Sequence, residues 1–66
     1  MLLTVNGRAS QVPTGTDLLG LLESLDLRPG TVVVEHNGTA LLRSELGGTP
    51  LRDGDRVELV RAVAGG

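Results

Sequence analysis

Residues 17–27 read Asp-Leu-Leu-Gly-Leu-Leu-Glu-Ser-Leu-Asp-Leu, and this stretch decides how the rest of the chain can fold. Four of its leucines have the i, i+3, i+4, i+7 spacing that lines one face of an α-helix: Leu18, Leu21, Leu22 and Leu25. Thr16 suits the N-cap position and Asp17 the positive end of the helix dipole. Residues 28–30, Arg-Pro-Gly, end the helix, because proline has no N–H to donate. The pattern predicts one amphipathic helix that packs on a sheet.

The segments before and after this helix have the composition of β-hairpins. Residues 2–5 are apolar and β-prone, and Asn6-Gly7 is typical of a tight hairpin turn into residues 8–12. After the helix, the β-branched residues 31–35 lead through a second Asn-Gly pair into residues 40–42. We therefore expect two hairpins, the second with a short returning strand.

The C-terminal third predicts one further strand. A helical turn at residues 43–46 and a loop at 47–50 precede a tight turn at 52–55. In residues 56–60, the first four then alternate polar and apolar, as a half-buried strand does. This alternation directs Val57 and Leu59 toward a core, and Glu58 and Val60 to the other face.

The predicted order is strand, strand, helix, strand, short strand, strand. This order is typical of an α+β fold of the β-grasp (ubiquitin-like) type, a mixed sheet of four to five strands with one main helix packed on one face. We expect residues 1–61 to form this domain and residues 62–66, Ala-Val-Ala-Gly-Gly, to be a flexible C-terminal tail. One helix covers only one sheet face, so we predict that the other face contacts a partner. This partner face includes Thr4, Glu58 and Val60, with Arg61 beside them.

The composition excludes several classes of function. The chain has 66 residues, a net charge of −2, one histidine, no cysteine and no aromatic residue. A cysteine-ligated iron–sulfur cluster is therefore excluded, and the dispersed arginines oppose nucleic-acid binding. No glycine-rich phosphate motif is present, so we expect no bound ATP or other cofactor. With no long apolar run, we expect no membrane association and a cytoplasmic protein that is monomeric when free.

Residues for catalysis or metal binding are sparse. The serines are scattered, and His36, the one possible base, precedes a turn where we expect a solvated side chain. Asp53 and Asp55 flank Gly54 as in a fragment of a calcium loop, but the other ligands are missing and a plain turn explains all three residues. We therefore predict no catalytic residue and no metal site.

The remaining reactive group is the terminal carboxyl of Gly66. An α-carboxyl has a pKa of about 3.5 and is ionised at neutral pH, so it can attack an activated phosphate but is inert as an electrophile. Gly65 and Gly66 have no side chains, so they can enter a narrow active site. Ala64, Val63 and Ala62 would follow them into it. The alternative reading is a frayed end without function.

The whole chain resembles the ThiS family of sulfur carriers. The resemblance lies in residues 3–7 (Leu-Thr-Val-Asn-Gly), 34–38 (Val-Glu-His-Asn-Gly), 43–45 (Arg-Ser-Glu), 51–58 (Leu-Arg-Asp-Gly-Asp-Arg-Val-Glu) and 63–66 (Val-Ala-Gly-Gly). The Gly-Gly end and the Asp-Gly-Asp turn also occur in the MoaD family, but MoaD-like chains are longer and have added helices. Leu46 differs from the family, where many members have an aromatic residue.

The resemblance implies a carrier that serves enzymes and is not one itself. An E1-like (ThiF-like) adenylyltransferase would adenylate Gly66 with its own ATP and Mg²⁺, and a sulfur donor enzyme would supply the sulfur of a thiocarboxylate. A ThiG-like thiazole synthase would then take that sulfur for thiamine biosynthesis. Two alternatives stay open: a MoaD-like carrier for molybdopterin or another pathway, and a β-grasp module that binds proteins and is never activated.

Overall fold

The computed structural model describes residues 1–61. Its elements are β1 (Leu2–Val5), β2 (Arg8–Gln11), α1 (Leu18–Ser24), the 3-10 helix η1 (Pro29–Thr31), β3 (Val32–His36), β4 (Thr39–Leu41), the 3-10 helix η2 (Arg43–Gly48) and β5 (Arg56–Arg61). The five strands form one sheet in the order β2-β1-β5-β3-β4. β1 and β5 run parallel and the other neighbours run antiparallel. The predicted mixed β-grasp sheet is confirmed, and the predicted tail, residues 62–66, lies outside the described residues.

Both Asn-Gly turns have the predicted conformation and also bind the central strand. Asn6 and Asn37 each have φ of 50°, and each is followed by a glycine with positive φ, which matches a type I′ hairpin turn. The side-chain oxygen of Asn6 accepts the backbone N–H of Leu59 at 2.7 Å. That of Asn37 accepts the N–H of Arg56 at 2.8 Å. The turns therefore tie both hairpins to β5.

The N-terminus of α1 is capped by Asp17, so the prediction of Thr16 was wrong. The Asp17 carboxylate accepts the Gly20 N–H at 2.8 Å, whereas the Thr16 hydroxyl donates to the Pro13 carbonyl at 2.7 Å. A carboxylate both accepts this N–H and carries the charge that the helix N-terminus favours. The acidic side chain is therefore the better cap of the two neighbours.

The helix ends at Ser24 and not at Leu27. Asp26 has φ of 58°, and the Leu27 N–H donates to the Leu22 carbonyl at 2.9 Å. With the bond from the Asp26 N–H to Glu23 at 3.0 Å, this is a Schellman closure of the helix end. Leu25 lies beyond the last helical turn and is 46% exposed. Its predicted place in the buried stripe was wrong, while the other three leucines of that stripe are buried.

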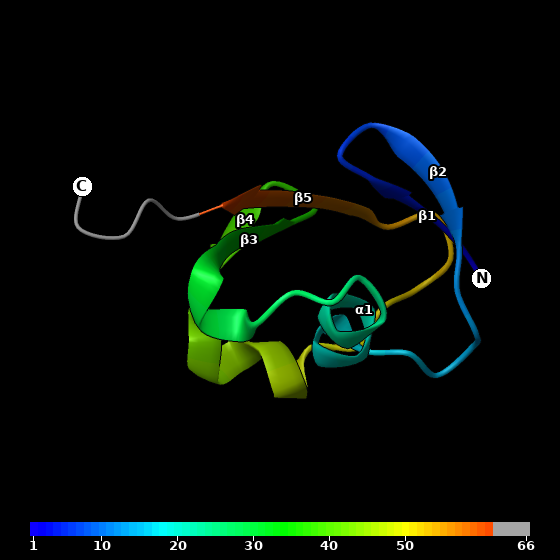
Figure 1. Cartoon of the computed structure of the whole chain (residues 1–66). Helices are drawn as coiled ribbons and strands as arrows, with labels where there is room; N and C mark the ends of the chain where they lie inside the picture. The colour runs from blue at the N-terminus through cyan, green and yellow to red at the C-terminus, as the bar shows by residue number, and fades with distance from the viewer. Residues whose placement is uncertain (62–66) are drawn as a thin grey trace.

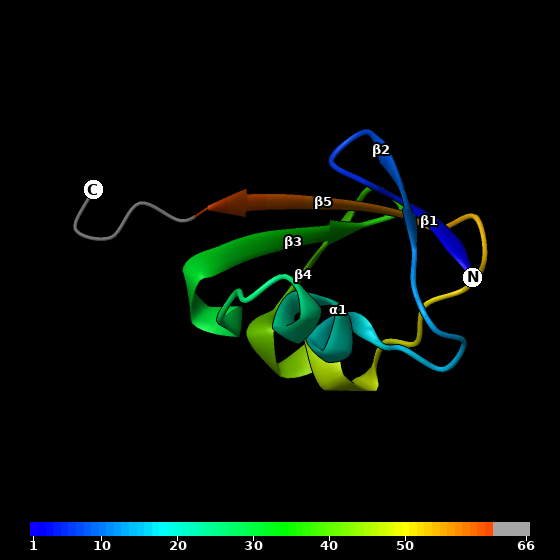
Figure 2. The same ribbon diagram turned by 45° about the vertical axis from the view of Figure 1, so that its right-hand side comes forward.

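The core consists of aliphatic side chains from α1, η2 and the facing side of the sheet. Figures 1 and 2 show α1 beneath the sheet, with the 3-10 turns on the same side. The buried hydrophobic residues are Leu3, Val5, Leu18, Leu21, Leu22, Val34, Leu46, Leu51 and Val57. Full burial of one such side chain contributes about 1.5–3 kcal/mol. Val57 is fully buried and Leu59 packs against this core, as their alternation predicted.

The remaining boundaries differ from prediction by a few residues. β2 ends at Gln11, one residue early, and β3 begins at Val32 because the preceding residues form η1. β4 begins one residue early and ends at Leu41. η2 continues to Gly48, so the predicted loop starts later, at Thr49.

The carboxylate of Asp55 fixes the turn that leads into β5. Asp55 is 9% exposed and accepts the Arg52 N–H at 2.9 Å, His36 Nε2–H at 2.8 Å and the Asn37 side-chain amide at 3.1 Å. The His36 side chain is 19% exposed and bonded to Asp55, so the expectation of a solvated side chain was wrong. Neighbouring Asp53 accepts the Leu2 N–H at 2.6 Å and holds β1 to the same turn.

Burial and hydrogen bonds act in opposite directions on the pKa of Asp55. Burial raises the pKa, while the bonds from His36, Asn37 and the Arg52 N–H, together with the charge of His36, lower it. The hydrogen bonds prevail, so the pKa of Asp55 lies below its ordinary value of 3.8. The ionised carboxylate therefore stabilises the fold, and this contribution is lost as pH falls through the lowered pKa.

Replacing the cap is expected to destabilise the domain. Asp17→Ala should lower the free energy of unfolding by about 1 kcal/mol, because the Gly20 N–H loses its acceptor. Urea unfolding followed by far-UV circular dichroism measures this, since the chain has no aromatic fluorophore. Thr16→Val is the matched control and should cost less; an equal or larger loss there would contradict the assignment of Asp17.

Replacing Asp55 is expected to change both stability and its pH dependence. Asp55→Asn should lower the unfolding free energy at neutral pH by about 1–3 kcal/mol, because buried donors lose their ionised acceptor. The difference from the wild type should shrink as the pH falls below about 4, because the unfolded chain takes up a proton at Asp55 first and the folded chain does so only below its lowered pKa. Glu23→Gln, at an exposed position of α1, serves as control. A difference that stays constant down to about pH 2 would contradict the lowered pKa.

Candidate functional site

The candidate site is the end of β5, from which the predicted tail continues. Gly66, the predicted site of modification, and residues 62–65, which were predicted to enter a partner's active site, lie outside the described residues. β5 lies between β1 and β3 and ends at Arg61, on the side of the molecule away from the N-terminus (Figure 1). The described structure therefore shows the strand that carries the tail and the two faces beside it.

The last residues of β5 have a strand neighbour on one side only, within residues 1–61. β1 pairs with Arg56 and Val57 and then turns away at Asn6. β3 continues alongside β5 until Val32 pairs with Arg61. One backbone edge at the end of β5 is therefore left open in this part of the chain.

The sheet face away from α1, here called the open face, includes three of the four predicted partner residues. The register places Thr4, Glu58 and Val60 on this face, with Val33, Glu35 and Ala40 beside them. Val33 and Val60 pair directly and are 47% and 56% exposed. The open face therefore carries an exposed aliphatic patch next to the end of β5.

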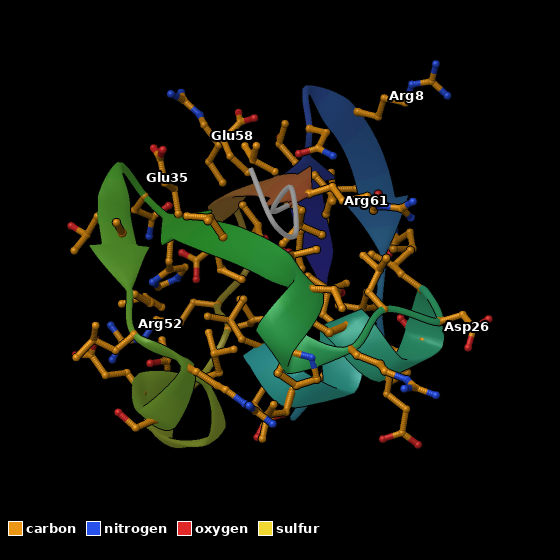
Figure 3. All side chains as sticks on the ribbon, turned by 60° about the vertical axis from the view of Figure 1, so that its left-hand side comes forward. Arg8, Asp26, Glu35, Arg52, Glu58 and Arg61 are labelled. Carbon is orange, nitrogen blue, oxygen red and sulfur yellow. The ribbon has the colours of Figure 1, made fainter. Side chains whose placement is uncertain are left out.

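Two carboxylates share this face. Glu35 and Glu58 are directly opposite each other on β3 and β5, and Figure 3 shows both on the same side of the sheet. Among residues 1–61, neither forms an ion pair. Like charges directly opposite each other in a sheet repel, so a cation placed between them would be stabilising. Sequence reasoning missed Val33 and Glu35, although alternation along residues 31–35 was a usable signal.

Arg61, the fourth predicted residue, is separated from the other three. It pairs with Val32, and both side chains lie on the α1 side of the sheet, where they line a groove. Figure 3 shows Arg61 extending in a different direction from Glu58. The structure thus gives the end of β5 two distinct sides, one with carboxylates and one with a guanidinium.

The described residues contain no arrangement typical of a catalytic or metal centre. His36 contacts Asp55, and none of the serine or threonine hydroxyls in residues 1–61 is bonded to it. No group of three or more His, Cys, Asp or Glu side chains in this range could hold a metal ion. Asp53 and Asp55 are occupied by backbone N–H groups, which confirms the interpretation of residues 52–55 as a plain turn.

The helices of the described part are short. The longest, α1, has seven residues, and none between residues 1 and 61 has the length and apolar character needed to cross a bilayer.

Comparison with known proteins identifies the family. The model of the ThiS family matches residues 3–66. The crystal structure of the thiamine biosynthesis protein ThiS from Geobacter metallireducens is 38% identical, with a TM-score of 0.86 and complete coverage of both chains. The solution structure of a thiamine biosynthesis protein from the same organism is also 38% identical, with a TM-score of 0.82 and coverage of 100% of this chain and 88% of the other. No curated protein gives a significant match. On the family match and these two structures, the chain belongs to the ThiS family.

Proposed function

We propose that the chain is a sulfur carrier of thiamine biosynthesis, and that its reactive group is the terminal carboxyl of Gly66. The observation that supports this most directly is the family match, which extends through the Gly65-Gly66 pair. The two similar structures of thiamine biosynthesis proteins favour the thiamine pathway over a MoaD-like role. The chain acts as a co-substrate of other enzymes and binds no cofactor of its own.

Activation has to occur on a partner enzyme, because a carboxylate is a poor electrophile. An oxygen of the Gly66 carboxylate bonds to the α-phosphorus of ATP, and pyrophosphate leaves. A sulfur nucleophile from a donor enzyme then attacks the carbonyl carbon, and AMP leaves with that oxygen. The donor sulfur is the outer sulfur of a persulfide, so this attack gives an acyl disulfide. A thiolate then attacks the donor's own sulfur: the S–S bond breaks, a disulfide forms on the donor, and the Gly66 thiocarboxylate leaves for use by thiazole synthase. ATP and Mg²⁺ belong to the E1-like activating enzyme.

The folded body determines where the tail can act. Residues 62–66 start at the end of the central strand and reach at most about 17 Å when fully extended. The carboxylates of aspartate and glutamate side chains in residues 1–61 lie on the folded body and lack this reach. An enzyme that binds Gly66 must therefore also lie close to the end of β5.

We assign the open face to the contact with the activating enzyme. Its exposed Val33 and Val60 supply apolar area, and the opposed Glu35 and Glu58 favour a basic side chain on the partner. Ordering the tail costs about 1–2 kcal/mol per residue, so contacts by the body must offset that cost. A β-grasp module that is never activated would use the same face and would not need Gly66.

Sulfur transfer should depend on the position of the terminal carboxyl. We expect intact-mass analysis of the chain, treated with its activating enzyme, ATP and a sulfur donor, to show the exchange of one oxygen for one sulfur. The exchange should vanish in a chain that lacks Gly66. It should also vanish in a chain extended by one residue, which keeps Gly65-Gly66 but moves the carboxyl.

The circular dichroism of both altered chains should match the wild type, since neither change touches residues 1–61. Continued sulfur transfer by the chain without Gly66 would refute the proposed function. A wild-type chain that binds the activating enzyme but is never modified would instead support the binding module.

Disrupting the open face should weaken binding without unfolding the domain. Glu58→Lys combined with Val60→Asp should raise the Kd for the activating enzyme by roughly tenfold or more, because a central apolar contact and a carboxylate are both lost. Isothermal titration calorimetry measures the Kd. Glu23→Lys repeats the Glu58→Lys substitution on α1 and should leave the Kd nearly unchanged. An unaltered Kd for the double variant would exclude this face as the contact.

A further inference from the structure

A groove lies on the opposite side of the sheet from the open face, between the β1–β2 hairpin and the end of α1. Its volume is about 510 Å³. Aliphatic side chains form its floor: Val5, Leu25, Leu27, Val32 and Leu59. Two of its lining residues, Leu59 and Arg61, belong to the last three residues of β5, so the groove lies directly beside the start of the predicted tail.

The groove exists because α1 is short. The Schellman closure at Asp26 stops the helix at Ser24, so no further helical turn covers this part of the sheet. Leu25, one of the leucines that line the groove, is 46% exposed. An apolar side chain of a partner that entered the groove would cover the exposed leucine and the apolar floor. Removing this apolar surface from water would favour binding.

The charged residues that line the groove are both arginines. Arg8 contributes from β2 and Arg61 from β5, and no carboxylate lines the groove among residues 1–61. Neither arginine forms an ion pair within that range. In Figure 3 the two lie on the same side of the molecule, with Arg52 on the other. An acidic residue on a partner would complement these cations, and more strongly where the apolar floor excludes water.

We infer that this groove receives a segment of the activating enzyme in which an apolar side chain is flanked by carboxylates. The inference rests on the proposed function. The activating enzyme must place the Gly66 carboxylate against a phosphate of ATP, and such a reaction depends on orientation. Contacts on both sides of the end of β5 fix the direction in which residues 62–66 leave. The carboxylates of the open face and the arginines of the groove also prevent the reversed orientation.

The test is the Kd of the full chain for the activating enzyme, measured by isothermal titration calorimetry. Leu25→Asp should raise the Kd roughly tenfold, because it places a carboxylate on the apolar floor beside the partner's acidic residues. Arg8→Glu should have an effect of the same sign. It is the more informative charge reversal, because Arg8 lies on the hairpin, far in sequence from the tail.

Two control variants match these changes outside the groove. Leu19→Asp makes the same substitution on α1, at an exposed leucine that does not line the groove. Arg52→Glu reverses an arginine on the other side of the molecule. Both should change the Kd by less than roughly twofold. Far-UV circular dichroism establishes that each variant is folded.

Several outcomes overturn the inference. If Leu25→Asp and Arg8→Glu each leave the Kd unchanged while the wild type is still converted to the thiocarboxylate, the groove plays no part and the proposed function stands. Failure of the wild type to be modified removes the proposed function, and the inference with it.

The third and fourth outcomes concern other occupants of the groove. Methyl NMR signals of Leu25 and Leu27 that shift when the chain is cut after Arg61 would show that its own tail fills the groove, and a shift with protein concentration would show a second copy there.

Discussion

The position of the central strand depends on hydrogen bonds that other segments make to it and to the turn before it. Asn37 and Asn6 bind the N–H groups of Arg56 and Leu59, and the carboxylate of Asp55 holds the preceding turn. Because side chains alternate along a strand, a slip of one residue would move Val57 from the core to the open face. These bonds therefore set the register of the sheet, the identity of both faces, and the point from which residues 62–66 continue.

The core is small, and the packing of α1 determines which surfaces are left exposed. Every buried hydrophobic side chain described is leucine or valine, contributed by the sheet, by α1 and by the segments after β4. A helix of seven residues covers only part of one sheet face. The uncovered part of that face becomes the groove, and the other face stays open with Val33 and Val60 exposed. Both candidate contact surfaces thus exist because one short helix covers only part of the sheet.

The sequence predicted the features that depend on local patterns and missed those that depend on contacts across the chain. The Asn-Gly turns and the alternation of residues 56–59 are local, and the structure confirms both. The bond between His36 and Asp55 joins residues 19 apart, which no local pattern reveals. Thr16 and Asp17 are adjacent candidates for one cap, and Asp26 adopts a positive φ that glycine adopts more readily, so both helix ends were misplaced. Side chains alternate between the two faces of a strand, so Arg61 lies on the opposite face from Val60. The sequence prediction did not extend this alternation to Arg61 and assigned it to the open face.

Under the proposed function, specificity for a partner enzyme has to come from the folded body, because two terminal glycines offer little to recognise. Gly65 and Gly66 have no side chains, and a channel that accepts one such end accepts others. The two sides of β5 supply what the glycines lack: Glu35 and Glu58 on one, Arg8 and Arg61 on the other. A partner with complementary charges binds in one orientation, and a partner with the charges exchanged places like charges together, which costs several kcal/mol by rough estimate. Under the proposed function, the terminal carboxyl is chemically generic, and the faces beside it would select the enzyme that uses it.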